Sequence, residues 1–222
     1  MEINNIWAVI PAYNEECSII IIVKKTKKYV NNVAVVDDGS KDKTKVSAEK
    51  AGAIVLRHIV NLGKGAALKT GCDLAVKKGA KFIITLDADA QHDPDDIPRF
   101  VEKLKKYDIV FSYRKASSKM PLVLRFGNFF ISIVANVLYG INLTDTQCGF
   151  RAFSKAAYKK IRWNASDYSM ESEMISRAGK QRLKYVQIPI QTIYSDKYKG
   201  TTIIDGIKIV LNMFWWKLFN SR

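Results

Sequence analysis

Short apolar runs alternate with helix-like stretches through the first half of this sequence, and this alternation restricts the fold more than any other feature. Five runs have the character of buried strands, at residues 7–10, 33–36, 54–56, 82–86 and 109–113. Helical patterns lie between them, at residues 18–29, 44–51, 66–77 and from residue 94 onward. The alternation predicts an α/β fold in which a mostly parallel central sheet is flanked by helices.

A carboxylate-rich turn follows the fourth apolar run. Asp87 and Asp89 are two positions apart, so in extended backbone their side chains leave the same face, and Gln91 continues the row. Mg²⁺ takes oxygen ligands and is usually held by one or two carboxylates together with substrate phosphates. The turn therefore predicts a metal–diphosphate site, although a short acidic motif also occurs in solvated turns.

Polar side chains follow other strands of the predicted sheet as well. Tyr13 comes after the first apolar run, and Asp37 and Asp38 come after the second. Ligands of such sheets bind beyond the carboxyl ends of the strands, and carboxylates gathered there repel one another unless a cation or a donor neutralises them. We expect these residues to line one crevice with the acidic turn. Taken singly, each also fits a tight turn or a helix start.

The composition excludes a disordered chain and favours an anionic partner. With 222 residues, 48% of them hydrophobic, the chain can bury a sizeable core. Its formal charge is +15, and residues 151–222 contain 14 basic and 5 acidic side chains. Nucleic acid, a lipid surface and a phosphorylated substrate all suit this charge. Because the sequence has no RRM, KH or helix-turn-helix signature, we expect no nucleic-acid partner.

Cysteine usage and hydropathy predict a cytoplasmic protein that associates peripherally with a membrane. Cys17, Cys72 and Cys148 lack CxxC spacing, so neither a disulfide framework nor a zinc site is expected. The first residues lack the basic region of a signal peptide. Residues 126–143 and 201–219 carry too many polar or charged positions to span a membrane comfortably. The second stretch ends in aromatic and cationic residues, which predicts an amphipathic membrane-surface helix over residues 201–222.

Five motifs occur in an order that resembles the family 2 inverting glycosyltransferases, which use nucleotide sugars. They lie at residues 11–16, 36–42, 61–65, 87–92 and 145–151. The last motif, together with Arg114 and Arg125, is similar to the branch of the dolichyl-phosphate mannose and glucose synthases. The resemblance implies a GT-A type nucleotide-sugar-binding domain over residues 1–200. Its nucleotide-binding part would cover roughly residues 1–113 and its acceptor-binding part roughly residues 114–200.

The resemblance also implies a role for individual residues. Mg²⁺ or Mn²⁺ would be bound by Asp87, Asp89 and Gln91. The catalytic residues would be Asp89, Arg114, Arg125 and Asp145. The nucleotide sugar would be bound by Pro11, Ala12, Tyr13, Glu15, Asp38, Lys64, Asp87, Ala88, Gln147, Arg151 and Lys197. Relatives usually have arginine where this chain has Lys197, which supplies a point charge without bidentate geometry. The metal would neutralise charge on the departing nucleoside diphosphate.

The expected activity is metal-dependent, inverting transfer of a hexose from a UDP- or GDP-sugar to dolichyl or polyprenyl phosphate at the cytoplasmic membrane face. Such an acceptor is already anionic near neutral pH, so it needs arginines to position it and no general base. One alternative is transfer to a hydroxyl of a lipid-linked or cell-surface glycan, which would need a base. Another is a basic protein that binds nucleic acid or membrane without catalysis.

Overall fold

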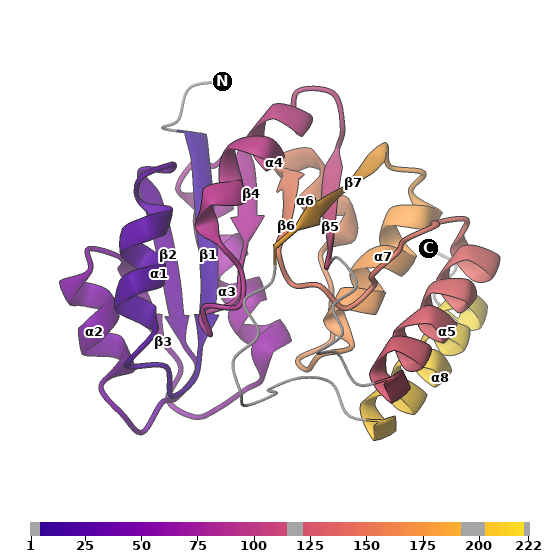
Figure 1. Ribbon diagram of the computed structural model, residues 1–222, viewed down its shortest axis with the longest axis horizontal. Helices are drawn as coiled ribbons and strands as arrows, with labels where there is room; N and C mark the ends of the chain where they lie inside the picture. Colours follow the sequence, from indigo (N-terminus) through magenta and orange to yellow (C-terminus); the bar gives the residue numbers. More distant parts are fainter. Residues whose placement is uncertain (1–4, 115–121, 192–202, 220–222) are drawn as a thin grey trace.

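A computed structural model of the protein describes residues 5–114, 122–191 and 203–219 (Figure 1). In chain order its elements are β1 (Ile6–Ala12), α1 (Ile19–Thr26), β2 (Asn32–Asp37), α2 (Thr44–Lys50), β3 (Ile54–Arg57), α3 (Lys64–Lys77), β4 (Phe82–Thr85), the 3₁₀ helix η2 (Pro94–Asp96), α4 (Ile97–Lys103), β5 (Ile109–Arg114), α5 (Leu122–Tyr139), β6 (Arg151–Ser154), α6 (Lys155–Ile161), α7 (Met170–Lys180), β7 (Tyr185–Ile190) and α8 (Ile203–Phe219). Each predicted strand is present within a few residues of its expected position.

The strands form one seven-stranded sheet in the order β3-β2-β1-β4-β6-β5-β7. All its strand pairs are parallel except those of β6, which is antiparallel to both β4 and β5. The predicted α/β class with a mostly parallel sheet is therefore confirmed. The sequence interpretation did not include β6, β7 or α6. β6 begins with Arg151 and ends with Ser154, so it is not an apolar run of the kind that marked the predicted strands.

Each face of the sheet is covered by its own hydrophobic core. Side chains of a strand alternate between the two faces, so in β1 Ile6, Ala8 and Ile10 join the core under α1, α2 and α4. Trp7 and Val9 join the core under α3, α5, α6, α7 and α8. Burial on both faces explains why the strands read as continuous apolar runs. A fully buried large apolar side chain contributes about 1.5–3 kcal/mol, which makes these two cores the main source of stability.

Helices α5 and α8 lie side by side at one end of the molecule (Figure 1). Their inner residues, such as Ile131 and Met213, are buried in the core. Their outer residues are also apolar, yet exposed, and we call them the α5/α8 apolar face: Phe129, Phe130, Ile133 and Val137 on α5, and Ile207, Leu211, Phe214, Trp215, Leu218 and Phe219 on α8.

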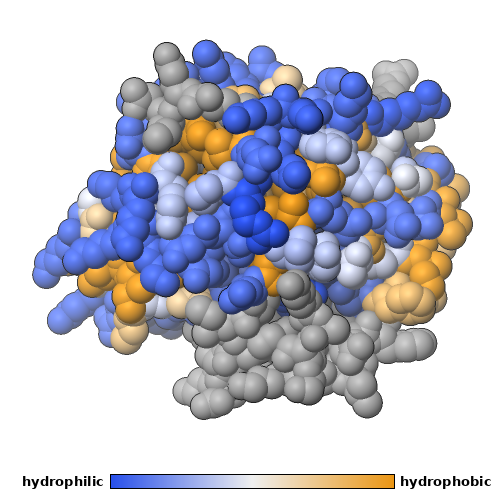
Figure 2. All heavy atoms as spheres, turned by 45° about the horizontal axis from the view of Figure 1, so that its top comes forward, coloured by the Kyte–Doolittle hydropathy of each residue, from blue (hydrophilic) through white to orange (hydrophobic). Residues whose placement is uncertain are grey.

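Hydrophilic side chains predominate on the face of the molecule shown in Figure 2. Hydrophobic side chains form several patches there, one of them along the right-hand edge, the side on which α5 and α8 lie in Figure 1. Over the parts of the chain that the structure describes, every helix falls short of the length and apolar character that a membrane crossing requires.

Candidate active site

One edge of the sheet collects most of the polar motifs. Strands β1, β2, β4 and β5 all end at this edge, which places Tyr13, Asp38, Asp87 and Arg114 there. Because β6 is antiparallel to its neighbours, its first residue, Arg151, lies at the same edge. The reversed strand thus brings the 145–151 motif beside the acidic turn.

The loops after β1 and β2 are joined to each other by hydrogen bonds. The backbone N–H of Asn14 donates to Ser40 Oγ at 2.9 Å, and that of Glu15 donates to Thr44 Oγ1 at 2.8 Å. Tyr13, next to this junction, is 43% exposed and offers its ring to a ligand. The two motifs therefore form one unit of backbone, with an aromatic face available at its surface.

Asp38 holds a third loop in place. Its carboxylate accepts hydrogen bonds from the N–H groups of Leu62 at 3.0 Å and Gly63 at 2.8 Å, and it lies 2.6 Å from His58 Nδ1. The residue is 3% exposed, so its observed contacts are all with the protein itself. Its predicted role at the nucleotide stays a prediction. His58 was missed by the sequence interpretation, because no motif marks it.

The glycines of the 61–65 motif admit a neighbouring loop at close range. Gly63 has φ +97°, a left-handed conformation that favours glycine, and a Cβ there would collide with the carbonyl of Ser166. A Cβ on Gly65 would lie 2.5 Å from the carbonyl oxygen of Ala165. The N–H of Ala66 donates to the Ser166 carbonyl at 3.1 Å. These contacts set the start of α3, and with it the position of Lys64.

Lys64 lies between two acidic side chains. Its Nζ is 2.8 Å from Asp87 Oδ1 and 3.1 Å from Glu171 Oε1. Burial alone would lower the pKa of the Lys64 ammonium, but these two carboxylates raise it above its ordinary value. In turn, burial would raise the pKa of Asp87, while Lys64 and then His92 hold it below its usual range. The Lys64 ammonium is thus shared between two carboxyl groups.

Asp89 is the less compensated carboxylate of the acidic turn. Burial, followed by the nearby charge of Asp87, raises the pKa of Asp89. Its Oδ1 accepts a hydrogen bond from the Gln91 N–H at 3.0 Å, and Ala90 between them adopts φ +61°. Asp87, Asp89 and Gln91 therefore follow one another in a tight turn and not in the extended backbone that the sequence suggested, and their role as metal ligands stays a prediction.

The donor set of this turn suits a divalent cation that shares its coordination with a diphosphate. Burial, and then repulsion from Asp87, raise the pKa of Asp89, and a bound cation would relieve that repulsion. Among the described residues, no three His, Cys, Asp or Glu side chains gather as a complete metal site. Two carboxylates completed by substrate phosphates are a usual arrangement for Mg²⁺. Bound there, the ion would neutralise charge on the diphosphate leaving group.

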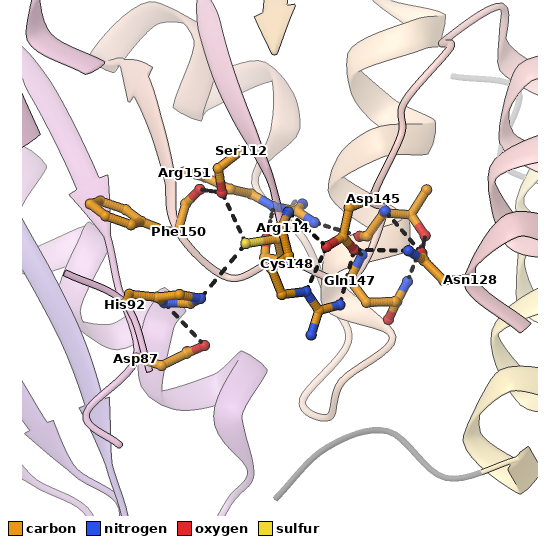
Figure 3. Close-up of polar contacts among 11 residues, drawn as sticks. Asp87, His92, Ser112, Arg114, Asn128, Asp145, Gln147, Cys148, Phe150 and Arg151 are labelled. Atoms are coloured by element: carbon orange, nitrogen blue, oxygen red, sulfur yellow. Dashed lines mark hydrogen bonds and ion pairs between the residues drawn. The ribbon is translucent and has the colours of Figure 1, made fainter. Parts of the chain in front are cut away.

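A buried chain of polar side chains runs from the acidic turn toward β5 (Figure 3). His92 Nδ1 lies 3.6 Å from Asp87 Oδ2, and His92 Nε2 lies 3.7 Å from Cys148 Sγ. Cys148 Sγ is in turn 2.9 Å from Ser112 Oγ. Burial would lower the pKa of His92, but Cys148 and Asp87 raise it. Sequence reasoning did not assign His92 and Cys148 to the site, although both lie inside motifs that it identified.

Arg114 and the buried Asp145 form a partly buried ion pair on the far side of this chain (Figure 3). Arg114 donates from Nε to Asp145 Oδ2 at 2.6 Å and from Nη2 to Oδ1 at 3.1 Å. Oδ1 also accepts from Asn128 Nδ2 and from the Gln147 N–H, each at 3.1 Å. Burial would raise the pKa of Asp145, but Arg114 holds it below its usual range. The structure thus brings together Arg114, Asp145 and Gln147, and adds Asn128 from α5.

Arg151 supports the motif from within the protein. It is 2% exposed, and it donates to the carbonyls of Cys148 at 2.8 Å, Thr146 at 2.7 Å and Glu171 at 2.9 Å. Its guanidinium carbon lies 5.3 Å from the centre of the Phe111 ring. These contacts tie the 145–151 motif to the first turn of α7. The predicted contact of Arg151 with the nucleotide sugar stays a prediction.

The structure describes some of the other predicted site residues and leaves two of their side chains undescribed. Ala12 and Ala88 are buried next to the site, at 2% and 3% exposure, whereas Pro11 is partly exposed. Arg125 belongs to α5, but its side chain is outside what the structure describes. Lys197 lies in the stretch 192–202, also outside the described residues.

Comparison with known proteins identifies the family. The chain matches the family model described as glycosyl transferase family 2 over residues 7–162, more than half of its length. The chain belongs to glycosyl transferase family 2. It is therefore a glycosyltransferase, and the interpretation as a non-catalytic nucleic-acid or membrane binder is set aside.

Two relatives of this glycosyltransferase are named for an enzymatic activity. The UDP-N-acetylglucosamine–dolichyl-phosphate N-acetylglucosaminyltransferase of Methanococcus voltae is 34% identical, over 96% of this chain and 96% of its own. The undecaprenyl-phosphate mannosyltransferase of Micrococcus luteus is 27% identical, over 96% of this chain and 94% of its own. The predicted likeness to the polyprenyl-phosphate branch of the family is confirmed. An uncharacterized protein of Methanocaldococcus jannaschii is 42% identical, over 98% of this chain and 95% of its own.

Solved structures show the fold. A crystal structure of glucosyl-3-phosphoglycerate synthase from Mycobacterium tuberculosis, in complex with Mn²⁺, UDP and glucosyl-3-phosphoglycerate, matches with a TM-score of 0.71. It is 20% identical, and the match covers 98% of this chain and 80% of that one. Another structure of the same synthase, with Mg²⁺ and UDP, matches with a TM-score of 0.72 at 21% identity, over 96% of this chain and 79% of that one. The family 2 glycosyltransferase described here has the predicted GT-A fold.

Proposed function

We propose that this glycosyltransferase transfers a hexose from a UDP- or GDP-sugar to dolichyl or polyprenyl phosphate. The reaction would use Mg²⁺ or Mn²⁺ and would invert the anomeric centre, at the cytoplasmic face of a membrane. Two relatives that match nearly the whole chain carry names of polyprenyl-phosphate glycosyltransferases, which supports the acceptor class. Free thiols at all three cysteines are consistent with a reducing compartment.

The observation that carries the proposal is a direct link between the site and the α5/α8 apolar face. Asn128 of α5 donates to Asp145, which pairs with Arg114 at the carboxyl edge of the sheet. The next residues of the same helix, Phe129 and Phe130, are 61% and 49% exposed. Exposed apolar patches of this kind mark membrane or partner contacts. A lipid phosphate that enters from a membrane against this face would thus meet the site through α5.

The state of the nearby carboxylates favours a phosphate acceptor over a hydroxyl. A hydroxyl acceptor needs a general base with a pKa near the working pH. Asp145 is paired with Arg114, which lowers its pKa, and Glu171 is paired with Lys64. Asp89, whose pKa burial and then Asp87 raise, is the proposed metal ligand, which would leave it unable to act as the base. Paired carboxylates are poor bases, whereas a phosphate acceptor needs none. Transfer to a glycan hydroxyl is therefore the second candidate.

We also propose a division of work along the chain. Residues 1–113 would bind the nucleotide, residues 114–200 would bind the acceptor, and residues 201–222 would rest on the membrane surface. One continuous sheet joins the first two parts, since β6 of the second part pairs with both β4 and β5 of the first. Donor and acceptor sites would therefore keep a fixed geometry, which transfer between two bound substrates requires.

The decisive experiment incubates purified protein with Mn²⁺ or Mg²⁺, a polyprenyl phosphate and a panel of UDP- and GDP-sugars, and identifies the lipid product by mass spectrometry. We expect a polyprenyl monophosphate hexose that forms only with metal. Arg125→Ala should lower the rate of transfer by about 100-fold, since a cation beside the lipid phosphate is lost. Exposed Lys159→Ala on α6 is the control and should change the rate by less than about twofold.

Two outcomes would contradict the proposal. If Arg125→Ala left transfer to polyprenyl phosphate unchanged while a glycan hydroxyl served as acceptor, the second candidate would replace the first. If no UDP- or GDP-sugar yielded any lipid product with either metal, the proposed acceptor would be wrong.

A further inference from the structure

Lys64 occupies the acidic turn in the way a metal ion would. Its ammonium is 2.8 Å from one oxygen of Asp87, and His92 Nδ1 is 3.6 Å from the other. A divalent cation at Asp87 would lie next to the Lys64 ammonium, and two cations so close in a buried site repel strongly. The ion pair that stabilises Asp87 without a ligand therefore competes with the metal that the proposed function requires there.

Glu171 offers Lys64 a second place. Its Oε1 is 3.1 Å from Lys64 Nζ, on a side chain that is 3% exposed. Apart from this ion pair, neither oxygen of the carboxylate has a hydrogen-bond partner within the described part of the chain, so the carboxylate can accept more fully from an ammonium. Its backbone is fixed, because Arg151 Nη1 donates to the Glu171 carbonyl at 2.9 Å. A lysine stem is flexible enough to shift between two neighbouring acceptors.

We propose that Glu171 is a positioning residue that takes over the Lys64 ammonium when a divalent cation binds at Asp87. With Glu171 in place, Lys64 leaves Asp87 without losing its ionic partner, and it stays at the site where the diphosphate arrives. Without Glu171, Asp87 is the one ionic partner left to Lys64 among the described residues, and the metal must displace a partly buried ammonium from it. This inference rests on the proposed use of a metal, and it does not depend on which acceptor the enzyme takes.

The test measures metal affinity directly. Free Mn²⁺ is monitored by electron paramagnetic resonance during titration of the protein with UDP, and then with GDP, in the absence of any acceptor. Glu171→Gln keeps the shape of the side chain and removes its charge, and we expect it to weaken Mn²⁺ binding by about tenfold. Glu171→Asp keeps the charge and should restore part of the loss.

Two variants control for the change in charge. Glu173 lies on the same turn of α7, but its carboxylate contacts Arg177 and the N–H groups of Asn164 and Ala165. Glu173→Gln should change Mn²⁺ affinity by less than about twofold. Asp167→Asn is the second control if Glu173→Gln does not fold, because the Asp167 side chain is 41% exposed and pairs with Lys208.

Kinetics separates positioning from damage to the fold. For Glu171→Gln we expect a higher Mn²⁺ requirement, with kcat at saturating Mn²⁺ kept within about threefold of the wild type. Unchanged Mn²⁺ affinity in Glu171→Gln, or an equal loss in the control that folds, would overturn the inference. If Mn²⁺ binding behaved as expected while no sugar reached polyprenyl phosphate, this inference would stand and the proposed acceptor would fall.

Discussion

At the scale of single residues, the polar groups of the site are mainly engaged with one another. Asp38 holds a loop, Arg151 holds backbone carbonyls, and Lys64 is shared by two carboxylates. Asp89 is the exception, since burial and the charge of Asp87 work against its ionised form. A carboxylate that is unfavourable in the protein alone is suited to binding a cation.

This contrast predicts separate effects on activity and stability at Asp89. Asp89→Ala should reduce transfer at least about 100-fold, because a metal ligand is lost. The melting temperature of the metal-free protein should change by less than about 3 °C, since the substitution also removes a repulsive charge. Thermal unfolding and an assay of the lipid product measure the two effects. Asp95→Ala, which removes an acceptor of the Tyr29 hydroxyl, is the control and should leave transfer intact.

A collapse of the fold in Asp89→Ala would contradict this prediction. Asp89 would then be a structural residue, and the metal site would have to be placed elsewhere.

At the scale of elements, α5 and α8 are apolar on two sides. The inner side packs in the core, and the outer side is the α5/α8 apolar face, on which Leu211 is 65% and Trp215 58% exposed. An apolar side of a helix is normally buried, so we expect the α5/α8 apolar face to contact another surface. The basic residues of the last third of the chain suit an anionic lipid surface.

Charges on this outer side should reduce membrane binding. Leu211→Glu together with Trp215→Glu is expected to lower partitioning onto anionic vesicles by at least about tenfold, because each lost apolar contact costs about 1.5–3 kcal/mol. Vesicle sedimentation measures the change. Ile21→Glu on α1 is the matched control, since Ile21 is 55% exposed and lies on the other face of the sheet. Equal losses in both variants would show that the α5/α8 apolar face has no special part in binding.

At the scale of the whole molecule, stability depends on pH through the ion pair between Arg114, at the end of β5, and Asp145, in the loop before β6. Asp145 is 4% exposed, and Arg114 lowers its pKa in the folded protein. A carboxyl group whose pKa is lowered on folding stabilises the native state above its unfolded pKa, which is 3.8 here. That stabilisation is lost as the pH falls through the lower, folded value.

Asp145→Asn should therefore destabilise the protein in a pH-dependent way. Near pH 7 we expect a loss of about 1.5–3 kcal/mol in the free energy of unfolding, because the charge-assisted hydrogen bonds between Arg114 and Asp145 are lost. The difference from the wild type should stay constant down to about pH 5 and shrink below about pH 4, where the wild-type carboxyl loses its charge. Urea unfolding at a series of pH values measures it. A difference that does not change with pH would mean that packing, not charge, explains the loss.

Much of the fold could be predicted because its signals are local. The strands of the first half are short, apolar and separated by helical patterns, so their positions along the chain and their parallel direction follow from the sequence. The acidic turn lies directly after one of them, which places Asp87 and Asp89 at the ligand-binding edge. Of the strands that were missed, β6 has a polar residue at each end, Arg151 and Ser154. In β7, Val186, Ile188 and Ile190 alternate with Gln187 and Pro189, a strand pattern that the sequence interpretation overlooked.

The sequence by itself thus determined the class of fold and the edge of the sheet at which the acidic turn lies, since both depend on neighbouring residues. Only the tertiary structure decided which charges meet. β6 runs against its neighbours and brings Asp145 to Arg114, and the close approach of a second loop to Gly63 sets Lys64 between Asp87 and Glu171. These partners are far apart along the chain, so only strand direction and packing in three dimensions bring them together.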